Sequence, residues 1–146
     1  MKKKVKISIY YEQVIDREKN SSELMLKGEL LYGLNDSYII SYDEYNGEFE
    51  NCHVTVTVRD KKTVSLVRRG NYCTDIYIEN GKSQSSEYMT PFGSFPVTVF
   101  GEKVCSDIDF ESGSGTLLFA YSIDFSGNYI SKNKIRIKIT PSEERN

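Results

Sequence analysis

The amino-acid sequence predicts an all-β protein, a single antiparallel up-and-down β-barrel of about eight to ten strands. Three observations lead to this prediction: the balance of residue types, an alternation with a period of two residues, and turn signals between the alternating segments. Valine and isoleucine total 23 of the 146 residues, whereas leucine and alanine total 9. β-Branched side chains favour strands, and alanine and leucine favour helices, so the composition favours strands.

Alternation of apolar and polar residues marks the individual strands, because successive side chains of a strand point to opposite faces. In chain order, the apolar faces are Val5/Ile7/Ile9/Tyr11, Leu24/Leu26/Leu30, Tyr38/Ile40/Tyr42, Val54/Val56/Val58, Val64/Leu66, Ile76/Ile78, Phe95/Val97/Val99, Ile108/Phe110, Leu117/Phe119/Tyr121/Ile123/Phe125 and Ile135/Ile137/Ile139. One buried and one solvated face in every strand is what a closed barrel requires, and closure also removes the sheet edges. A two-sheet sandwich is the alternative.

Turn residues separate these segments. The chain has Asn-Gly pairs at 46–47 and 80–81, which suit two-residue hairpin turns because both central residues need positive φ. Further signals lie at 60–62, 113–115 and 126–128. The spacing predicts strands joined by short hairpins.

Length and charge fit one soluble domain, with residues 1–140 as the barrel and 141–146 as a polar tail. A net charge of −2 gives no general attraction to nucleic acid or to anionic membranes. The chain has no apolar run long enough for a membrane span and no apolar segment after its basic start. Three widely spaced cysteines are typical of free thiols, so the expected location is the cytoplasm.

The sequence nominates no metal site, cofactor or catalytic centre. Cys52 and the one histidine, His53, are neighbours, and neighbours in a strand point to opposite faces. No nucleophile elbow or phosphate loop occurs. We therefore expect a protein that is not an enzyme.

Two charged regions deserve separate interpretations. Lys134, Arg136 and Lys138 form the outer face of the last strand, which pairs with the lysine-rich first strand if the barrel closes. Such a basic surface can bind phosphates, but the domain is not basic overall, so solubility and edge protection are favoured over nucleic-acid binding. Asp43 and Glu44 belong to an acidic run that is predicted to lie at the surface.

Arg68 is the charged residue predicted to point inward, because it continues the face of Val64 and Leu66. It stands near one mouth of the barrel, just before Gly70. An inward arginine there suits a carboxylate or phosphate group of a ligand. The alternatives are an arginine that reaches water at the rim or one that pairs with an acid.

Several segments together resemble the YwiB-like family of small bacterial proteins of unknown function. They are Gly28–Leu30, Tyr38–Tyr42, Val67–Gly70, Tyr88–Gly93 and Asn133–Ile139. The resemblance covers nearly the whole chain, and Tyr88–Gly93 is its most specific part. It implies a calycin- or lipocalin-like barrel with room for an internal pocket, and it transfers no catalytic residue.

These observations support a non-enzymatic barrel that binds a small apolar or amphipathic ligand, since small barrels can hold one ligand inside. Arg68 is the candidate for an anionic group, and Tyr88 and Tyr42 are the candidate pocket walls. A barrel with a packed interior that acts by protein interaction, for example as a homodimer, is the alternative. An RNA- or phosphate-binding barrel is the third.

Overall fold

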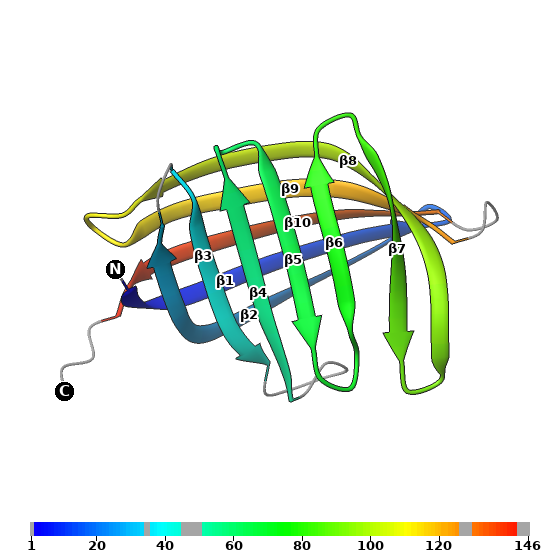
Figure 1. The fold of residues 1–146 in the computed structure, drawn as a ribbon, viewed down its shortest axis with the longest axis horizontal. Coiled ribbons are helices and arrows are strands. Elements are labelled where there is room, and N and C mark those ends of the chain that lie inside the picture. Colours follow the sequence, from blue (N-terminus) through cyan, green and yellow to red (C-terminus); the bar gives the residue numbers. More distant parts are fainter. Residues whose placement is uncertain (1, 34–35, 45–50, 126–129, 143–146) are drawn as a thin grey trace.

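The computed structural model describes residues 2–33, 36–44, 51–125 and 130–142, and it has ten strands in this part of the chain (Figure 1). The strands are β1 (Lys2–Ile15), β2 (Glu18–Tyr32), β3 (Tyr38–Glu44), β4 (Cys52–Arg59), β5 (Thr63–Arg69), β6 (Thr74–Glu79), β7 (Ser83–Thr90), β8 (Gly93–Asp109), β9 (Ser114–Asp124) and β10 (Ile130–Pro141). The predicted all-β class and strand number are confirmed.

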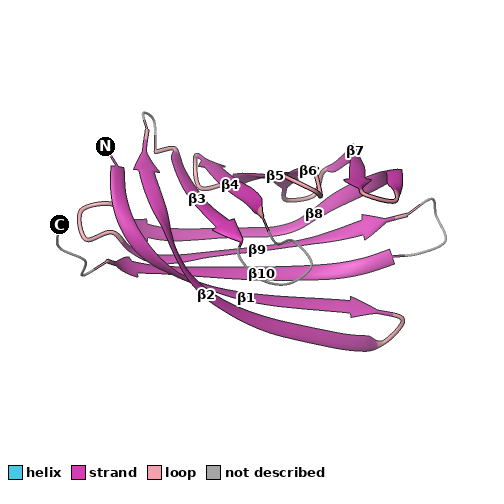
Figure 2. Ribbon diagram, turned by 90° about the horizontal axis from the view of Figure 1, so that it is seen from below, coloured by secondary structure: helices cyan, strands magenta, loops and turns pink. Residues whose placement is uncertain are grey.

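All ten strands belong to one antiparallel sheet in the order β6-β5-β4-β3-β2-β1-β10-β9-β8-β7. Neighbours in the sheet are neighbours in the chain, apart from β1 and β10, so the topology is up-and-down. β1 and β10 pair from Val5↔Pro141 to Ile15↔Ser131, which joins the first and last strands as the sequence predicts. Viewed from below, the shorter strands β3–β7 lie across the long strands β1, β2 and β8–β10 (Figure 2).

The barrel is nearly closed, and its seam lies between β6 and β7. Cys73 and Met89 exchange two backbone hydrogen bonds of 2.8 and 3.0 Å at one end of the seam. At the other end, Gly101 of β8 accepts from the Gly81 N–H at 2.8 Å and donates to the Lys82 carbonyl at 2.9 Å. Between these points no backbone ladder joins β6 to β7 in the described structure.

Turn positions agree with the sequence where the structure describes them. Asp60 and Lys61 have positive φ between β4 and β5, and Gly81 has a φ of 80° between β6 and β7. The turns predicted at 46–47 and 126–128 lie outside the described residues, as do residues 143–146 of the predicted tail.

The predicted alternation separates core from surface along most strands. β10 alternates strictly from Ser131 to Ile139, with Ile135, Ile137 and Ile139 buried and the residues between them exposed. The inward faces form one core, in which Phe119, Ile7 and Leu30 are among the largest fully buried side chains. Within the described ranges, the structure has no helix of the length and hydrophobicity that a membrane span needs.

Candidate functional site

A cavity of about 180 Å³ lies at one end of the core, and we call it the interior cavity. Its apolar lining comes from β1, β2, β5, β6 and β10, and its polar lining from β1, β2, β3, β5, β7 and β9. The apolar residues are Ile9, Leu24, Leu66, Ile76, Ile135 and Ile137, and the polar ones are Tyr11, Ser22, Tyr42, Glu44, Arg68, Tyr88 and Tyr121. The cavity is therefore lined both by apolar side chains and by hydroxyl and charged groups.

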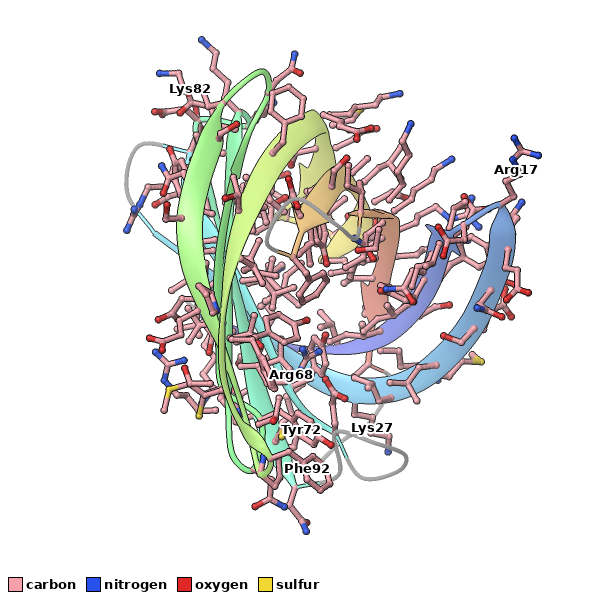
Figure 3. All side chains as sticks on the ribbon, turned by 90° about the vertical axis from the view of Figure 1, so that its right-hand side faces the viewer. Arg17, Lys27, Arg68, Tyr72, Lys82 and Phe92 are labelled. Carbon is pink, nitrogen blue, oxygen red and sulfur yellow. The ribbon has the colours of Figure 1, made fainter. Side chains whose placement is uncertain are left out.

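The structure brings the three predicted ligand-binding residues together at this cavity. Tyr42 continues the inward face of β3, and Arg68 continues that of β5. Tyr88 comes from β7 and packs edge-on against Phe125, with 6.2 Å between ring centroids. Figure 3 shows Arg68 inside the curve of the strands, whereas Arg17 and Lys82 lie at the outer rim. Strand alternation thus predicts the inward positions of Tyr42 and Arg68, and the binding role of all three residues stays a prediction.

Glu44 corrects one expectation of the sequence analysis, because it is buried rather than at the surface. Its Oε1 accepts hydrogen bonds from Nη2 of Arg68 at 3.0 Å and from Nε at 3.4 Å. The side chain of Arg68 is 13% exposed and that of Glu44 is 9% exposed. Glu44 continues the inward series of Ile40 and Tyr42, so alternation with a period of two predicts its inward position. The acidic composition of the surrounding run obscured that signal, while its neighbour Asp43 is exposed and bonds to His53.

The buried ion pair sets the electrostatics of the cavity. Desolvation works against the charged form of Arg68, but Glu44 and the nearby tyrosines outweigh it and raise the pKa of the guanidinium. Burial raises the pKa of the Tyr42 hydroxyl, and Glu44 adds to this effect while Arg68 opposes it. Burial likewise raises the pKa of Tyr121 well above its ordinary value. The two tyrosines therefore remain neutral hydroxyls at physiological pH.

A second cluster of polar side chains lies where β1 and β10 form the cavity wall. The Tyr11 hydroxyl donates to Oδ1 of Asn133 at 2.7 Å, and Nε2 of Gln13 donates to the same oxygen at 3.1 Å. The Asn133 amide donates to Oγ of Ser131 at 3.1 Å. Asn133 and Ser131 occupy inward positions of β10, and their paired amide and hydroxyl groups hold Tyr11 at the cavity wall. Neither residue was predicted from the sequence, although both continue the inward face of Ile135 toward the start of β10.

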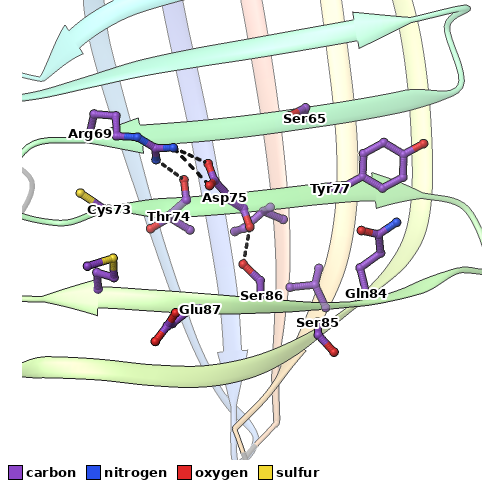
Figure 4. A pocket seen from close by; sticks show the side chains of 13 residues that line it. Ser65, Arg69, Cys73, Thr74, Asp75, Tyr77, Gln84, Ser85, Ser86 and Glu87 are labelled. Atoms are coloured by element: carbon purple, nitrogen blue, oxygen red, sulfur yellow. Dashed lines mark hydrogen bonds and ion pairs between the residues drawn. The ribbon is translucent and has the colours of Figure 1, made fainter.

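A larger hollow of about 550 Å³ lies over the seam between β6 and β7 (Figure 4). Several of its polar side chains are exposed, and some of them bond to one another. Arg69 makes two hydrogen bonds with the Asp75 carboxylate, at 3.0 and 3.1 Å, and the Ser86 hydroxyl bonds to the Asp75 carbonyl. Ile76 lines both hollows. We regard the smaller interior cavity as the candidate site because it is walled by the core, and ligand sites bury most of a ligand's surface.

The predicted basic surface lies on the outside of the barrel. Lys134, Arg136 and Lys138 are exposed along β10, and the Arg136 guanidinium stacks over the Tyr10 ring at 5.2 Å. The acidic side chain of Glu12 shares this face of β1 and pairs with Lys19 at 2.7 Å. The surface is separate from the interior cavity, and a role in phosphate binding stays a prediction.

Metal-ligand clusters are absent from the part of the chain that the structure describes: no group of three or more His, Cys, Asp or Glu side chains is placed to hold an ion. His53 points outward and Cys52 is buried, as the alternation predicts.

Comparison with known proteins places the chain in a family. A family model described as a domain of unknown function, DUF1934, matches residues 7–137. The chain belongs to the DUF1934 family. A crystal structure of the ywiB protein from Bacillus subtilis matches this DUF1934 chain with a TM-score of 0.77 and 16% sequence identity, over 97% of this chain and 93% of that one. At this identity the match shows a shared fold, and it confirms the predicted YwiB-like resemblance. No curated protein matches the DUF1934 chain.

Proposed function

We propose that this DUF1934 barrel is a non-enzymatic binding protein that holds one small amphipathic molecule in the interior cavity. The observation that carries the proposal is the cavity itself, where Tyr42, Tyr88 and the Arg68–Glu44 pair face apolar side chains inside the core. Ligand sites typically combine an apolar lining with a few placed polar groups in this way. The competing interpretation, a packed barrel that acts by dimerising, does not account for a cavity with such a lining.

The size of the cavity limits the ligand. A cavity of about 150 Å³ in another protein is large enough for benzene. The interior cavity, at about 180 Å³, is similar, and it is well below the 300–1,000 Å³ of most drug-sized sites. The ligand is therefore a compact molecule of roughly benzene size, and a long acyl chain does not fit inside.

The calycin- or lipocalin-like relationship and the cytoplasmic location are parts of the same proposal. An internal ligand site fits the calycin- or lipocalin-like relationship. The three cysteines are free in the structure, which supports a reducing compartment.

Phenol is a suitable first probe, because it combines a ring of the right size with one hydroxyl. Titration of the ¹⁵N-labelled protein should give saturable NMR shifts that centre on Leu66, Ile76 and Tyr121. Leu66→Phe puts a ring into the cavity and should weaken phenol binding and these shifts, whereas Val67→Phe, on the outward position next to it, should leave them unchanged.

Two results would overturn the proposal. One is a set of shifts that lies only on the outer surface. The other is saturable binding of phenol that is as tight in Leu66→Phe as in the unaltered protein.

A further inference from the structure

The charges at the interior cavity cancel, and this limits the ligand further. Arg68 and Glu44 are the charged residues among the described cavity walls, and they pair at 3.0 Å with both side chains largely buried. The other polar groups of the wall are hydroxyls, including those of Tyr42, Tyr88 and Tyr121. The described part of the cavity wall therefore offers hydrogen bonds to a ligand without offering net charge.

An anionic ligand would meet a specific penalty at this site. To reach the Arg68 guanidinium from the cavity, its carboxylate has to lie close to the Glu44 carboxylate, which already accepts from both Nε and Nη2. Two carboxylates that share a buried site repel each other strongly, because little water screens them. A neutral hydroxyl or carbonyl group meets no such repulsion and finds tyrosine hydroxyls that donate or accept.

A cationic ligand is disfavoured by the same pair. Its charge would have to lie beside the Arg68 guanidinium, and the Glu44 carboxylate is already occupied by that guanidinium. Burial of an unpaired ammonium group is costly. The remaining class is an uncharged molecule with an apolar body and one or two hydroxyl or carbonyl groups.

We propose that the interior cavity selects neutral, hydroxyl- or carbonyl-bearing ligands, and that Glu44 determines this selectivity by neutralising Arg68. The inference rests on the proposed function and names the ligand class of the same site. It assigns to Glu44 a specificity role, and it makes Arg68 a structural partner of Glu44 rather than the receptor of an anion.

Phenol and benzoate test this inference, because they share a ring and differ in charge. In the unaltered protein we expect phenol to bind at least about tenfold more tightly than benzoate, a difference that corresponds to about 1.4 kcal/mol. Glu44→Gln keeps an acceptor for Arg68 and removes the negative charge, so benzoate affinity should rise about tenfold or more while phenol affinity changes little. Asp43→Asn removes the neighbouring, outward carboxylate and should leave both affinities unchanged.

A further variant guards against a folding defect in Glu44→Gln. Arg68→Gln retains Glu44 and should exclude benzoate even more strongly than the unaltered protein does. Preferential binding of benzoate by the unaltered protein, or an unchanged ratio in a folded Glu44→Gln, would overturn the inference while leaving the proposed function intact. Failure of both probes to reach the cavity would instead overturn the proposed function.

Discussion

The two halves of the barrel interior differ although the same strands build them. Along β3, the fully buried Ile40 is followed inward by Tyr42 and Glu44, and along β9, Phe119 is followed by Tyr121. The rings of Phe119 and Tyr121 stack with 6.2 Å between centroids, so the change from an apolar to a hydroxyl-bearing interior occurs within one step of the alternation. We call the region of Ile40 and Phe119 the filled half and the region of the interior cavity the hollow half.

The two halves contribute differently to the stability of the fold. Close packing in the filled half supplies the hydrophobic contribution to folding, and each buried apolar side chain contributes about 1.5–3 kcal/mol. The hollow half gives up part of that contribution and buries an ion pair, which rarely stabilises a fold more than apolar packing would. Unfilled volume and buried charges therefore do not serve stability, and the proposed binding function gives them a role.

The largest expected effect comes from the filled half. Phe119→Ala should lower the free energy of unfolding by about 3–5 kcal/mol, because it removes a fully buried ring and leaves a void. Leu118→Ala, at the outward position beside it, should cost less than about 1 kcal/mol. Urea unfolding measures both, and similar losses in the two variants would show that β9 is oriented differently.

In the hollow half, the ion pair should be more sensitive to the loss of one partner than of both. Arg68→Met leaves a buried carboxylate alone and should cost about 3 kcal/mol, whereas Arg68→Met combined with Glu44→Leu should recover most of the loss. Arg69→Met, next along β5 but exposed, should change the free energy of unfolding by no more than about 0.5 kcal/mol. A lower stability of the double variant than of Arg68→Met alone would contradict this account of the ion pair.

In the filled half, the buried Tyr38 should make the stability of the protein depend on pH in the alkaline range. Burial raises the pKa of Tyr38 to about 12, although its hydrogen bond with Ser106 opposes the shift. The folded state then keeps a proton that the unfolded chain loses near pH 10, so stability is complete below pH 10 and falls as the pH rises toward 12. In Tyr38→Phe, the free energy of unfolding should therefore fall by about 2 kcal/mol less over this pH range than in the unaltered protein.

Urea unfolding between pH 9 and pH 12 measures the dependence. Tyr32→Phe serves as a control because Tyr32 is exposed at the end of β2. A Tyr38→Phe protein with the same pH dependence as the unaltered chain would contradict the burial argument.

Much of the fold was predictable because alternation is a local property. The inward face of β5 was evident from Val64, Leu66 and Arg68, and a barrel was expected because each strand has one apolar and one polar face. Glu44 obeys the same rule, yet it stands in an acidic run where composition suggests a surface. The rule of alternation was more reliable there than the character of the neighbouring residues.

The seam between β6 and β7 was not predictable in this way. Asn80–Gly81 marks a hairpin turn, and a hairpin implies a paired ladder. Pairing is instead diverted to β8, where Gly101 approaches the backbone of Glu79 so closely that a Cβ would lie 2.2 Å from its carbonyl oxygen. That approach depends on the bulge in β8 near residues 101–103, which arises from the three-dimensional course of the strand. The volume of the interior cavity is a collective property of several strands for the same reason.

Overpacking is the most direct test of the difference between the two halves. Ile40→Phe and Leu66→Phe each add a ring to an inward position, one in the filled half and one at the cavity wall. The Ile40→Phe protein should lose about 1–3 kcal/mol in urea unfolding, because a packed core accepts extra atoms only with strain. The Leu66→Phe protein should remain within about 1 kcal/mol of the unaltered chain, since the cavity has room for the ring. Equal losses in the two variants would contradict the hollow interior on which the proposed function depends.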